Sequence, residues 1–471
     1  MILGFKCQLQ WIIDIQVINT PRKKKGKKKM SNEQKNKQVP ETEHQEPRHG
    51  NSSGILDYQE INNSERDAMK GDTVGETLYS AKWILNSLLS LSKVYEEGWN
   101  ESIENELCTL WDMTAEKDVV EFLLDQEFFK MAEFTLKISE EPRLTEIIVG
   151  IVGNMCCQAK SLQVLLNSEE LVSLILSLVT SDDKETLIQV LRILQAALWD
   201  VQKNPESLWL KKIQECEIIG EAITFILKSS TSDELLTPTI DLVYLISQIE
   251  LPSNDLLERL FNIDQLVFAL CESITELISQ EKHCHSEAQL KNIESWFNIL
   301  FNIMELNLLK LSESADDENF NKINNVLIKI LEPYEESSNL MLLDEQSLLC
   351  IHRCIKLTSS FQTNEMFPPA ELIHSILKVT INLKRASSEQ DCKDTNDFKD
   401  LYLYAARYWK ETLENINKQE ILKILRLCQP KTVKDIETVT TITESSLHSI
   451  DKFLEAKSML SSIEDNTQLE L

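Results

Sequence analysis

Apolar residues recur at a helical spacing along most of the chain, from about residue 77 to about residue 425. Positions spaced i, i+3, i+4 and i+7 form one apolar stripe on a helix. Clear examples are Leu171, Leu174, Ile175 and Leu178; Leu187, Val190, Leu191 and Leu194; Val267, Leu270, Cys271 and Ile274; and Ile293, Trp296, Phe297 and Leu300. No segment alternates convincingly between apolar and polar residues. The pattern therefore predicts an all-α protein.

These predicted helices repeat along the chain. Segments 132–155 and 174–197 align without gaps at an offset of 42 residues, and the alignment places Leu136 on Leu178. A third, less regular copy covers 220–246. Two helices joined by an acidic turn, with a period of about 40 residues, are typical of armadillo and HEAT repeats. We expect an armadillo/HEAT-like α-α superhelix.

Polar pairs at capping-box spacing predict where several helices begin, because their side chains can satisfy the free backbone N–H groups of a first turn. The pairs are Asn167 with Glu170, Asp182 with Glu185, and Thr231 with Glu234. Segments 312–319, 386–397 and 431–446 are polar and are predicted to be loops.

The chain divides into three predicted parts. Residues 1–72 are polar with a basic run, and we expect a disordered N-terminal arm. Residues 73–430 form the predicted armadillo-like repeat domain. Residues 431–471 are predicted to be a threonine-rich linker followed by a C-terminal helix.

The N-terminal arm contains the run PRKKKGKKK at 21–29, which matches a nuclear-import signal but also fits a solvated charge run. Met30 opens an ordinary-looking start, so the sequence leaves open whether residues 1–29 are translated. The apolar stretch before the run contains Lys6 and Asp14, and its basic residues follow it. That order does not fit a secretory signal, so we expect a soluble, intracellular protein with no membrane partner.

The net charge is −28, and residues 73–471 carry 35 basic against 66 acidic residues, a net −31. A surface this acidic repels phosphate backbones. We therefore expect no nucleic-acid partner, and instead a partner protein with a basic or amphipathic segment. The eleven cysteines lie mostly in apolar helical patterns, which favours free thiols in a reducing compartment over a disulfide framework.

Two glycines lie inside the predicted buried helix 142–157. Gly150 and Gly153 each cost about 1 kcal/mol of helix propensity relative to alanine. We expect them where a second helix crosses closely, so that both are structural packing positions. On this hypothesis, Gly153→Leu lowers stability by about 1–3 kcal/mol through overpacking.

The segment IVGNM at 151–155 resembles the third helix of an armadillo repeat, in which an asparagine binds the backbone of an extended peptide. Asn154 falls on that asparagine, but the accompanying tryptophan four residues earlier is Gly150 here. In the next unit the two positions are Ala196 and Arg192. The tryptophan–asparagine ladder is therefore absent.

Four segments together resemble the serum amyloid A-like protein family: GETLYSAKW (75–83), ENELCTLWDM (104–113), EKDVVEFL (116–123) and PRLTEIIVGIVGNM (142–155). The resemblance implies an armadillo-like helical fold, a nuclear location and a link to the promotion of cell proliferation. It carries over no catalytic residue. Within these segments, Trp111 is expected to be a packing residue and not a binding anchor, because large aromatic side chains usually supply buried area.

Two groups of metal-ligating residue types occur, His283–Cys284–His285 and Cys350, His352 and Cys354. Neither has the four ligands at compatible spacing that a structural zinc site needs, and His352 is expected on a different helix face from the two cysteines. The sequence contains no phosphate-binding glycine loop, nucleophile elbow or zinc-protease helix. We expect no metal, no cofactor and no enzyme activity.

The predicted function is a protein-interaction scaffold, nuclear or alternatively cytoplasmic, whose acidic inner surface holds a partner segment. Asn154 and Arg192 are the candidate partner-binding residues, although either could instead brace neighbouring helices. The alternative function is a nucleocytoplasmic transport adaptor that binds basic cargo, which partner turnover by a small GTPase would reveal. The sequence does not define the oligomeric state.

Overall fold

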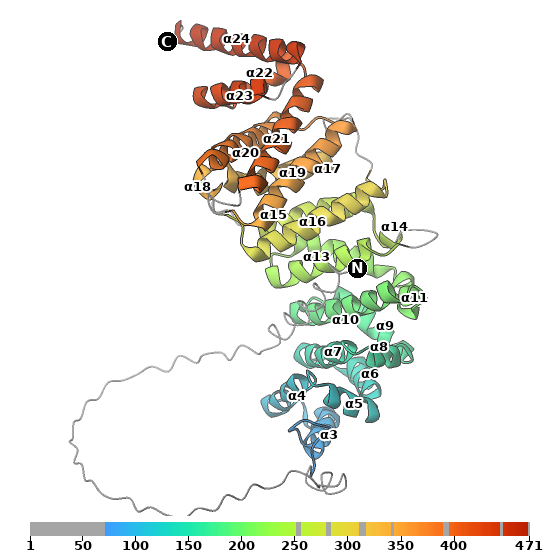
Figure 1. Cartoon of the computed structure of the whole chain (residues 1–471). Helices are drawn as coiled ribbons and strands as arrows, with labels where there is room; N and C mark the ends of the chain where they lie inside the picture. Colours follow the sequence, from blue (N-terminus) through green and yellow to red (C-terminus); the bar gives the residue numbers. More distant parts are fainter. Residues whose placement is uncertain are drawn as a thin grey trace, which may run out of the picture. The chain divides into compact units, whose positions relative to one another are not determined.

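The computed structural model describes residues 71–469 except for 251–255, 279–283, 310–316, 341–342, 365, 390–394 and 443–445 (Figure 1). All but the last two residues of the predicted N-terminal arm therefore lie outside the described residues. The described residues form 22 α-helices and two short 3-10 helices. They contain no β-strand, only one isolated bridge between Thr73 and Ser80. The prediction of an all-α helical-repeat protein is confirmed.

The chain forms two compact units, one of residues up to 135 with 139–161, and one of residues 136–138 with 162–471. The first contains α3 (Ala81–Glu97), α4 (Glu101–Met113), α5 (Lys117–Asp125), most of α6 (Phe128–Ile138) and α7 (Pro142–Cys156). In it, α4 packs against both α3 and α7. Leu107, Leu110 and Ile147 are fully buried, so the apolar stripes of α4 and α7 form its core.

Apart from residues 136–138, the second unit begins within α8 (Ala159–Leu166). It continues with α9 (Glu169–Ser177), η1 (Leu178–Thr180), α10 (Lys184–Lys203), α11 (Leu208–Glu215), α12 (Ile218–Ser229), α13 (Asp233–Ser247), α14 (Leu256–Leu260), α15 (Ile263–Leu277), α16 (Glu287–Glu305), α17 (Glu318–Leu331), η2 (Glu332–Glu335), α18 (Ser337–Leu340), α19 (Glu345–Thr363), α20 (Ala370–Glu389), α21 (Thr395–Asn415), α22 (Lys418–Arg426), α23 (Pro430–Ile442) and α24 (Leu447–Leu469).

Two layers of helices run through the second unit. In layer A, α12, α15, α17 and α20 pack in succession, and in layer B, α10, α13, α16, α19 and α21 do the same. Each repeat contributes one helix to each layer and buries its apolar stripe between them, as with Leu270 and Ile274 of α15. The sequence repeats correspond to successive helices: 174–197 covers the end of α9, η1 and most of α10, and 220–246 covers most of α12 and α13.

The predicted helix starts are each one residue early. The N-cap residues are Ser168, Asp183 and Ser232, and of these only Asp183 caps with its side chain, accepting the Thr186 N–H at 2.8 Å. The predicted capping boxes are therefore wrong in detail. A complete capping box does occur at Ser286 and Gln289, where α16 begins.

The predicted threonine-rich linker is also wrong, because most of it is α23. Val433, Ile436 and Val439 form a buried stripe at helical spacing. The Thr440 hydroxyl donates a hydrogen bond to the Ile436 carbonyl at 2.9 Å and accepts one from the indole N–H of Trp409 at 3.0 Å. Threonine is thus satisfied inside this helix, where sequence composition alone indicated a loop.

The other two predicted loops are shorter than expected. Helix α20 extends to Glu389 and α21 begins at Thr395, while α17 begins at Glu318 after the N-cap Asp317. The intervening residues lie outside the described part of the chain. No single described helix is long and apolar enough to cross a membrane, and only α7 and α8 taken together pass the same test.

Candidate partner-binding site

The four segments behind the family resemblance meet in pairs within the first unit. Segment 75–83 contacts 116–123, where the Glu76 N–H donates to Asp118. Segment 104–113 contacts 142–155, where Asn154 donates to the Trp111 carbonyl. The first pair forms an open pocket, and the second forms a close helix–helix contact that we name the α4–α7 seam.

The loop before α3 is held in a defined conformation by its own hydrogen bonds. The Val74 N–H donates to the Tyr79 carbonyl at 2.9 Å, and the Ala81 N–H donates to the Asp72 carbonyl at 2.8 Å. The Asp72 carboxylate accepts the Ser80 hydroxyl and the Lys82 N–H, and these bonds lower the pKa of Asp72. Residues 76–78 therefore form the fixed tip of a short loop.

Gly75 lets this loop lie directly on the first turn of α5. Its φ is +55°, a left-handed conformation that favours glycine. A Cβ atom at this position would lie 2.0 Å from Oδ2 of Asp118. The same oxygen accepts the Glu76 N–H at 2.6 Å, and a carboxylate in a first turn also suits the helix dipole. Gly75 and Asp118 together anchor the loop to α5.

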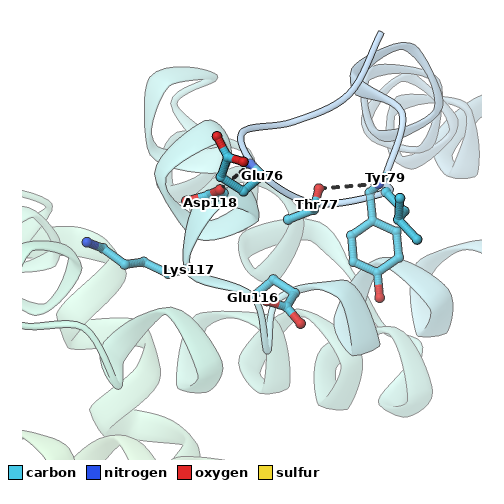
Figure 2. Close-up of a pocket in the computed structure, with 7 residues that line it drawn as sticks. Glu76, Thr77, Tyr79, Glu116, Lys117 and Asp118 are labelled. Carbon is cyan, nitrogen blue, oxygen red and sulfur yellow. Dashed lines mark hydrogen bonds between the residues drawn. The ribbon is translucent and has the colours of Figure 1, made fainter. Parts of the chain in front are cut away.

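The loop and the start of α5 enclose a pocket of about 400 Å³ (Figure 2). Its lining is Glu76, Thr77, Leu78, Tyr79, Glu116, Lys117 and Asp118. Three carboxylates against one ammonium give the lining a net formal charge of −2, and the Lys117 ammonium lies 3.5 Å from Glu121 of the same helix. Leu78 is 96% exposed. The pocket, which sequence analysis did not find, thus offers carboxylate acceptors beside one apolar side chain.

The α4–α7 seam accounts for Gly150. The indole of Trp111 lies directly over this residue, and a Cβ atom there would be 2.2 Å from the ring carbon Cζ2. Trp111 is half-buried, and among the described residues its buried indole nitrogen has no hydrogen-bond partner. Gly153 is buried in the same helix. The side chain missing from position 150 makes room for a tryptophan from the neighbouring helix.

Asn154 links the two helices of the seam. Its Nδ2 donates to the Trp111 carbonyl at 3.2 Å and to Oγ1 of Thr114 at 2.9 Å, and the residue is buried. The Trp111 carbonyl also accepts the Thr114 N–H at 3.1 Å, so the amide of Asn154 adds a bond from α7 to a turn that already closes the end of α4. The described contacts of this amide nitrogen therefore brace two helices.

Arg143 closes the other end of the seam and was missed by sequence analysis. Its guanidinium donates to Glu104 at 2.9 Å, to Glu146 at 2.5 Å and to the sulfur of Cys108 at 3.3 Å. Partial burial raises the pKa of the Cys108 thiol. The only sequence signal was a basic residue three positions before an acidic one on α7. At both ends of the seam, polar groups join the two helices.

Arg192, the second predicted partner-binding residue, lies on α10 in the other unit. Its guanidinium donates to Oε1 of Gln189, one turn earlier, at 2.5 Å. Arg192 is half-exposed. Arg192 therefore belongs to the second unit, whereas Asn154 belongs to the first.

The two cysteine- and histidine-containing segments both approach Tyr334. The ring of His285 lies edge-on to that of Tyr334 at 5.7 Å, and burial and the nearby Cys350 raise the pKa of Tyr334. Burial also raises the pKa of Cys354. Within the described part of the chain, no group of three or more His, Cys, Asp or Glu residues could hold a metal ion. His283 lies outside the described residues.

No family model matches the chain. It is 31% identical over 209 residues to Protein saal1 of Danio rerio, covering 42% of this chain and 40% of that one. It is 34% identical over 189 residues to Protein SAAL1 of Homo sapiens (37% and 39% covered) and 33% identical over 195 residues to Protein SAAL1 of Mus musculus (38% and 40%). The matches thus span about two fifths of the length of these curated relatives.

The crystal structure of an engineered protein aligns with 79% of this chain and 98% of its own, at 13% identity and a TM-score of 0.27. A likeness this low carries no argument. The similarity to the SAAL1 proteins supports the resemblance drawn from the four segments.

Proposed function

We propose that the chain is a non-enzymatic protein-interaction scaffold of the SAAL1 type, which holds a basic, amphipathic segment of a partner at the pocket between the 71–80 loop and α5. The family resemblance supports a nuclear site of action and a link to cell proliferation. The basic run at 21–29 is compatible with nuclear import.

One observation carries this proposal. Of the four segments that mark the resemblance, two meet at the α4–α7 seam, where the described contacts join helices, while the other two form the pocket and leave carboxylates open to solvent. Glu116 is exposed and makes no side-chain capping bond to α5. Carboxylates of this kind can accept hydrogen bonds from an arginine or lysine side chain.

The surroundings of the pocket favour a segment that is both basic and apolar. Leu78, at 96% exposure, offers an apolar contact next to Glu76. The net −31 of residues 73–471 attracts a basic segment over a longer range and accelerates encounter, while the pocket sets the register. A purely apolar segment gains only the contact with Leu78, and the carboxylates repel an acidic segment.

The test is affinity capture from cell extract with the full chain as bait. The salt concentration is raised from about 0.1 M to about 1 M, which shortens the Debye length from about 10 Å to about 3 Å. The test variant is Glu76→Lys with Glu116→Lys. The matched control is Glu206→Lys with Glu221→Lys, two exposed positions with the same change in charge. Retained proteins are identified and quantified by mass spectrometry.

The proposal predicts a stoichiometric partner that is released by salt, lost with the pocket variant and kept with the control. Equal loss with both variants would show that only net charge matters. A partner that is retained at high salt, and that the pocket variant still captures, would place recognition on another, apolar surface.

A further inference from the structure

A second surface, in the other unit, has the opposite character to the acidic pocket. It lies on three successive layer B helices, α16, α19 and α21. We name it the cationic patch and define it by Phe301, Leu349, Lys356, Leu403, Tyr404 and Arg407. It combines exposed apolar side chains with cations in a chain of net charge −28.

Contacts between side chains link the three helices of the patch. On one side of α19, the Lys356 ammonium lies 4.8 Å from the centre of the Phe301 ring of α16. Beside it, Arg353 donates to Glu294 of α16 at 2.8 Å. On the other side of α19, the His352 ring lies 4.5 Å from that of Tyr404 of α21. The patch therefore crosses both helix junctions.

The apolar part of the patch is unusual for layer B. Leu349 is 42% exposed and Leu403 is 49% exposed. Among the described residues of the five layer B helices, no other large apolar side chain is exposed to this degree. They lie on adjacent helices, and each is within four residues of the His352–Tyr404 contact. Two exposed leucines beside a ring pair suit a partner's apolar side chain.

The cationic part of the patch includes two cations that are not in ion pairs within the described residues. Glu294 already pairs with Arg353. Within the described residues, Lys356 and Arg407 have no carboxylate at ion-pair distance, and Lys356 faces the Phe301 ring. Burial raises the pKa of Tyr404, Glu411 raises it further, and the nearby Arg407 opposes this shift. Lys356 and Arg407 can therefore form ion pairs with carboxylates of a partner without breaking an existing ion pair.

We propose that the cationic patch docks a short acidic segment of a partner protein, in which a leucine or phenylalanine is flanked by carboxylates. The apolar side chain contacts Leu349 and Leu403, and the carboxylates pair with Lys356 and Arg407. This surface is separate from the pocket of the proposed function, and neither proposal depends on the other.

Charge complementarity favours a short acidic peptide over a nucleic acid. A peptide with two or three carboxylates needs only the cations of the patch, since charges beyond a Debye length of about 8 Å are largely screened at physiological salt. A nucleic acid strand would continue past the patch and meet a protein of net charge −28. Aromatic rings beside cations also suit base stacking, so single-stranded DNA serves as a competing probe.

The test measures peptide binding to the full chain by fluorescence anisotropy. The probes are labelled peptides of about 12 residues in which Glu and Asp alternate with Leu and Phe. A second set carries Lys at every acidic position, and a third probe is oligothymidylate of about 20 nucleotides. The test variant is Lys356→Glu with Arg407→Glu. The control, Lys431→Glu with Lys434→Glu on α23, changes two exposed lysines and the same net charge.

The proposal predicts that the acidic peptides bind best, that the test variant weakens them by about tenfold or more, and that the control changes affinity less than about threefold. The test variant should also gain affinity for the lysine-containing set. If the charge reversal prevents folding, judged by circular dichroism, Lys356→Gln with Arg407→Gln gives the same test with a smaller loss.

Three results would overturn the proposal. The acidic peptides could bind no better than the lysine-containing set, they could be weakened equally by the control, or they could be unaffected by the test variant. If oligothymidylate binds more tightly than the peptides and is lost with the same variant, the patch is a nucleic-acid site instead.

Discussion

Consecutive repeat helices are joined in different ways in the two units. At the α4–α7 seam, a tryptophan lies over a glycine and one asparagine braces the helix end. At the α13–α16 contact, three polar pairs do the joining: Asn292 with Thr237, Ser295 with Asp241, and Asn302 with Ser247, at 2.9–3.3 Å. No glycine lies in either of these two helices.

The difference shows what a glycine is for in this fold. Where an indole from the next helix must fit over a helix backbone, only the absence of a side chain makes room. Where short polar side chains connect two helices, ordinary residues suffice. The first contact depends on shape as well as on hydrogen bonds, and the second depends on hydrogen bonds. A side chain added at the glycine therefore tests the first contact alone, whereas removal of an amide tests both.

The largest effect is expected from Gly150→Leu. The new side chain would occupy the position of the Trp111 ring, and overpacking of this severity costs about 3 kcal/mol. Urea denaturation followed by circular dichroism measures the loss. The same substitution in a Trp111→Ala background should cost clearly less, because the obstructing ring is gone. An equal cost in both backgrounds would mean that Trp111 is not what requires the glycine.

A smaller, matched pair of effects is expected from Asn154→Ala and Asn302→Ala. Each removes an amide that donates to one carbonyl and one hydroxyl on a neighbouring helix. Each should lower the free energy of unfolding by about 1–2 kcal/mol. Denaturation midpoints measured side by side test this equivalence. A loss confined to Asn302→Ala would show that the seam rests on shape alone.

Gly75→Ala should cost about 1 kcal/mol, since a left-handed conformation is unfavourable for alanine and the methyl group meets Asp118. The loss should be local, because the affected loop lies at one edge of its unit. Hydrogen exchange measured by mass spectrometry should show faster exchange in residues 72–80 and little change in α4 and α7. Unchanged exchange in the loop would contradict the anchoring role of this residue pair.

The smallest effect is expected from Asp241→Asn at the α13–α16 contact. Burial raises the pKa of Asp241 despite Lys291 and Ser295, so the folded state holds this proton to higher pH than the unfolded state. The associated stabilisation is complete below the unfolded pKa and disappears as the pH rises through the folded pKa. Asparagine should therefore raise stability at pH 7, by less than about 1 kcal/mol, and not at pH 3. A loss of stability at pH 7 would show that the Lys291 pair dominates.

The sequence predicted the helices and their repeat because both depend on local periodicity. It also indicated that Gly150 needs a close neighbour, but not that Trp111, far away in sequence, is that neighbour. The pocket was missed for the same reason, since Glu76 and Asp118 are 42 residues apart and only folding brings them together. The prediction of a linker at 431–446 was wrong for a different reason. The threonines there were interpreted as loop residues, whereas the apolar stripe of Val433, Ile436 and Val439 packs as one face of a helix.

The central claim is that the pocket binds the partner segment, whereas the α4–α7 seam stabilises the fold. It is tested most directly by measuring partner capture and unfolding free energy together for two variants of the full chain. The account predicts that Glu76→Lys with Glu116→Lys abolishes capture at unchanged stability, and that Asn154→Ala lowers stability but retains capture under folding conditions. Capture lost with Asn154→Ala and kept with the pocket variant would contradict the account and place recognition at the α4–α7 seam.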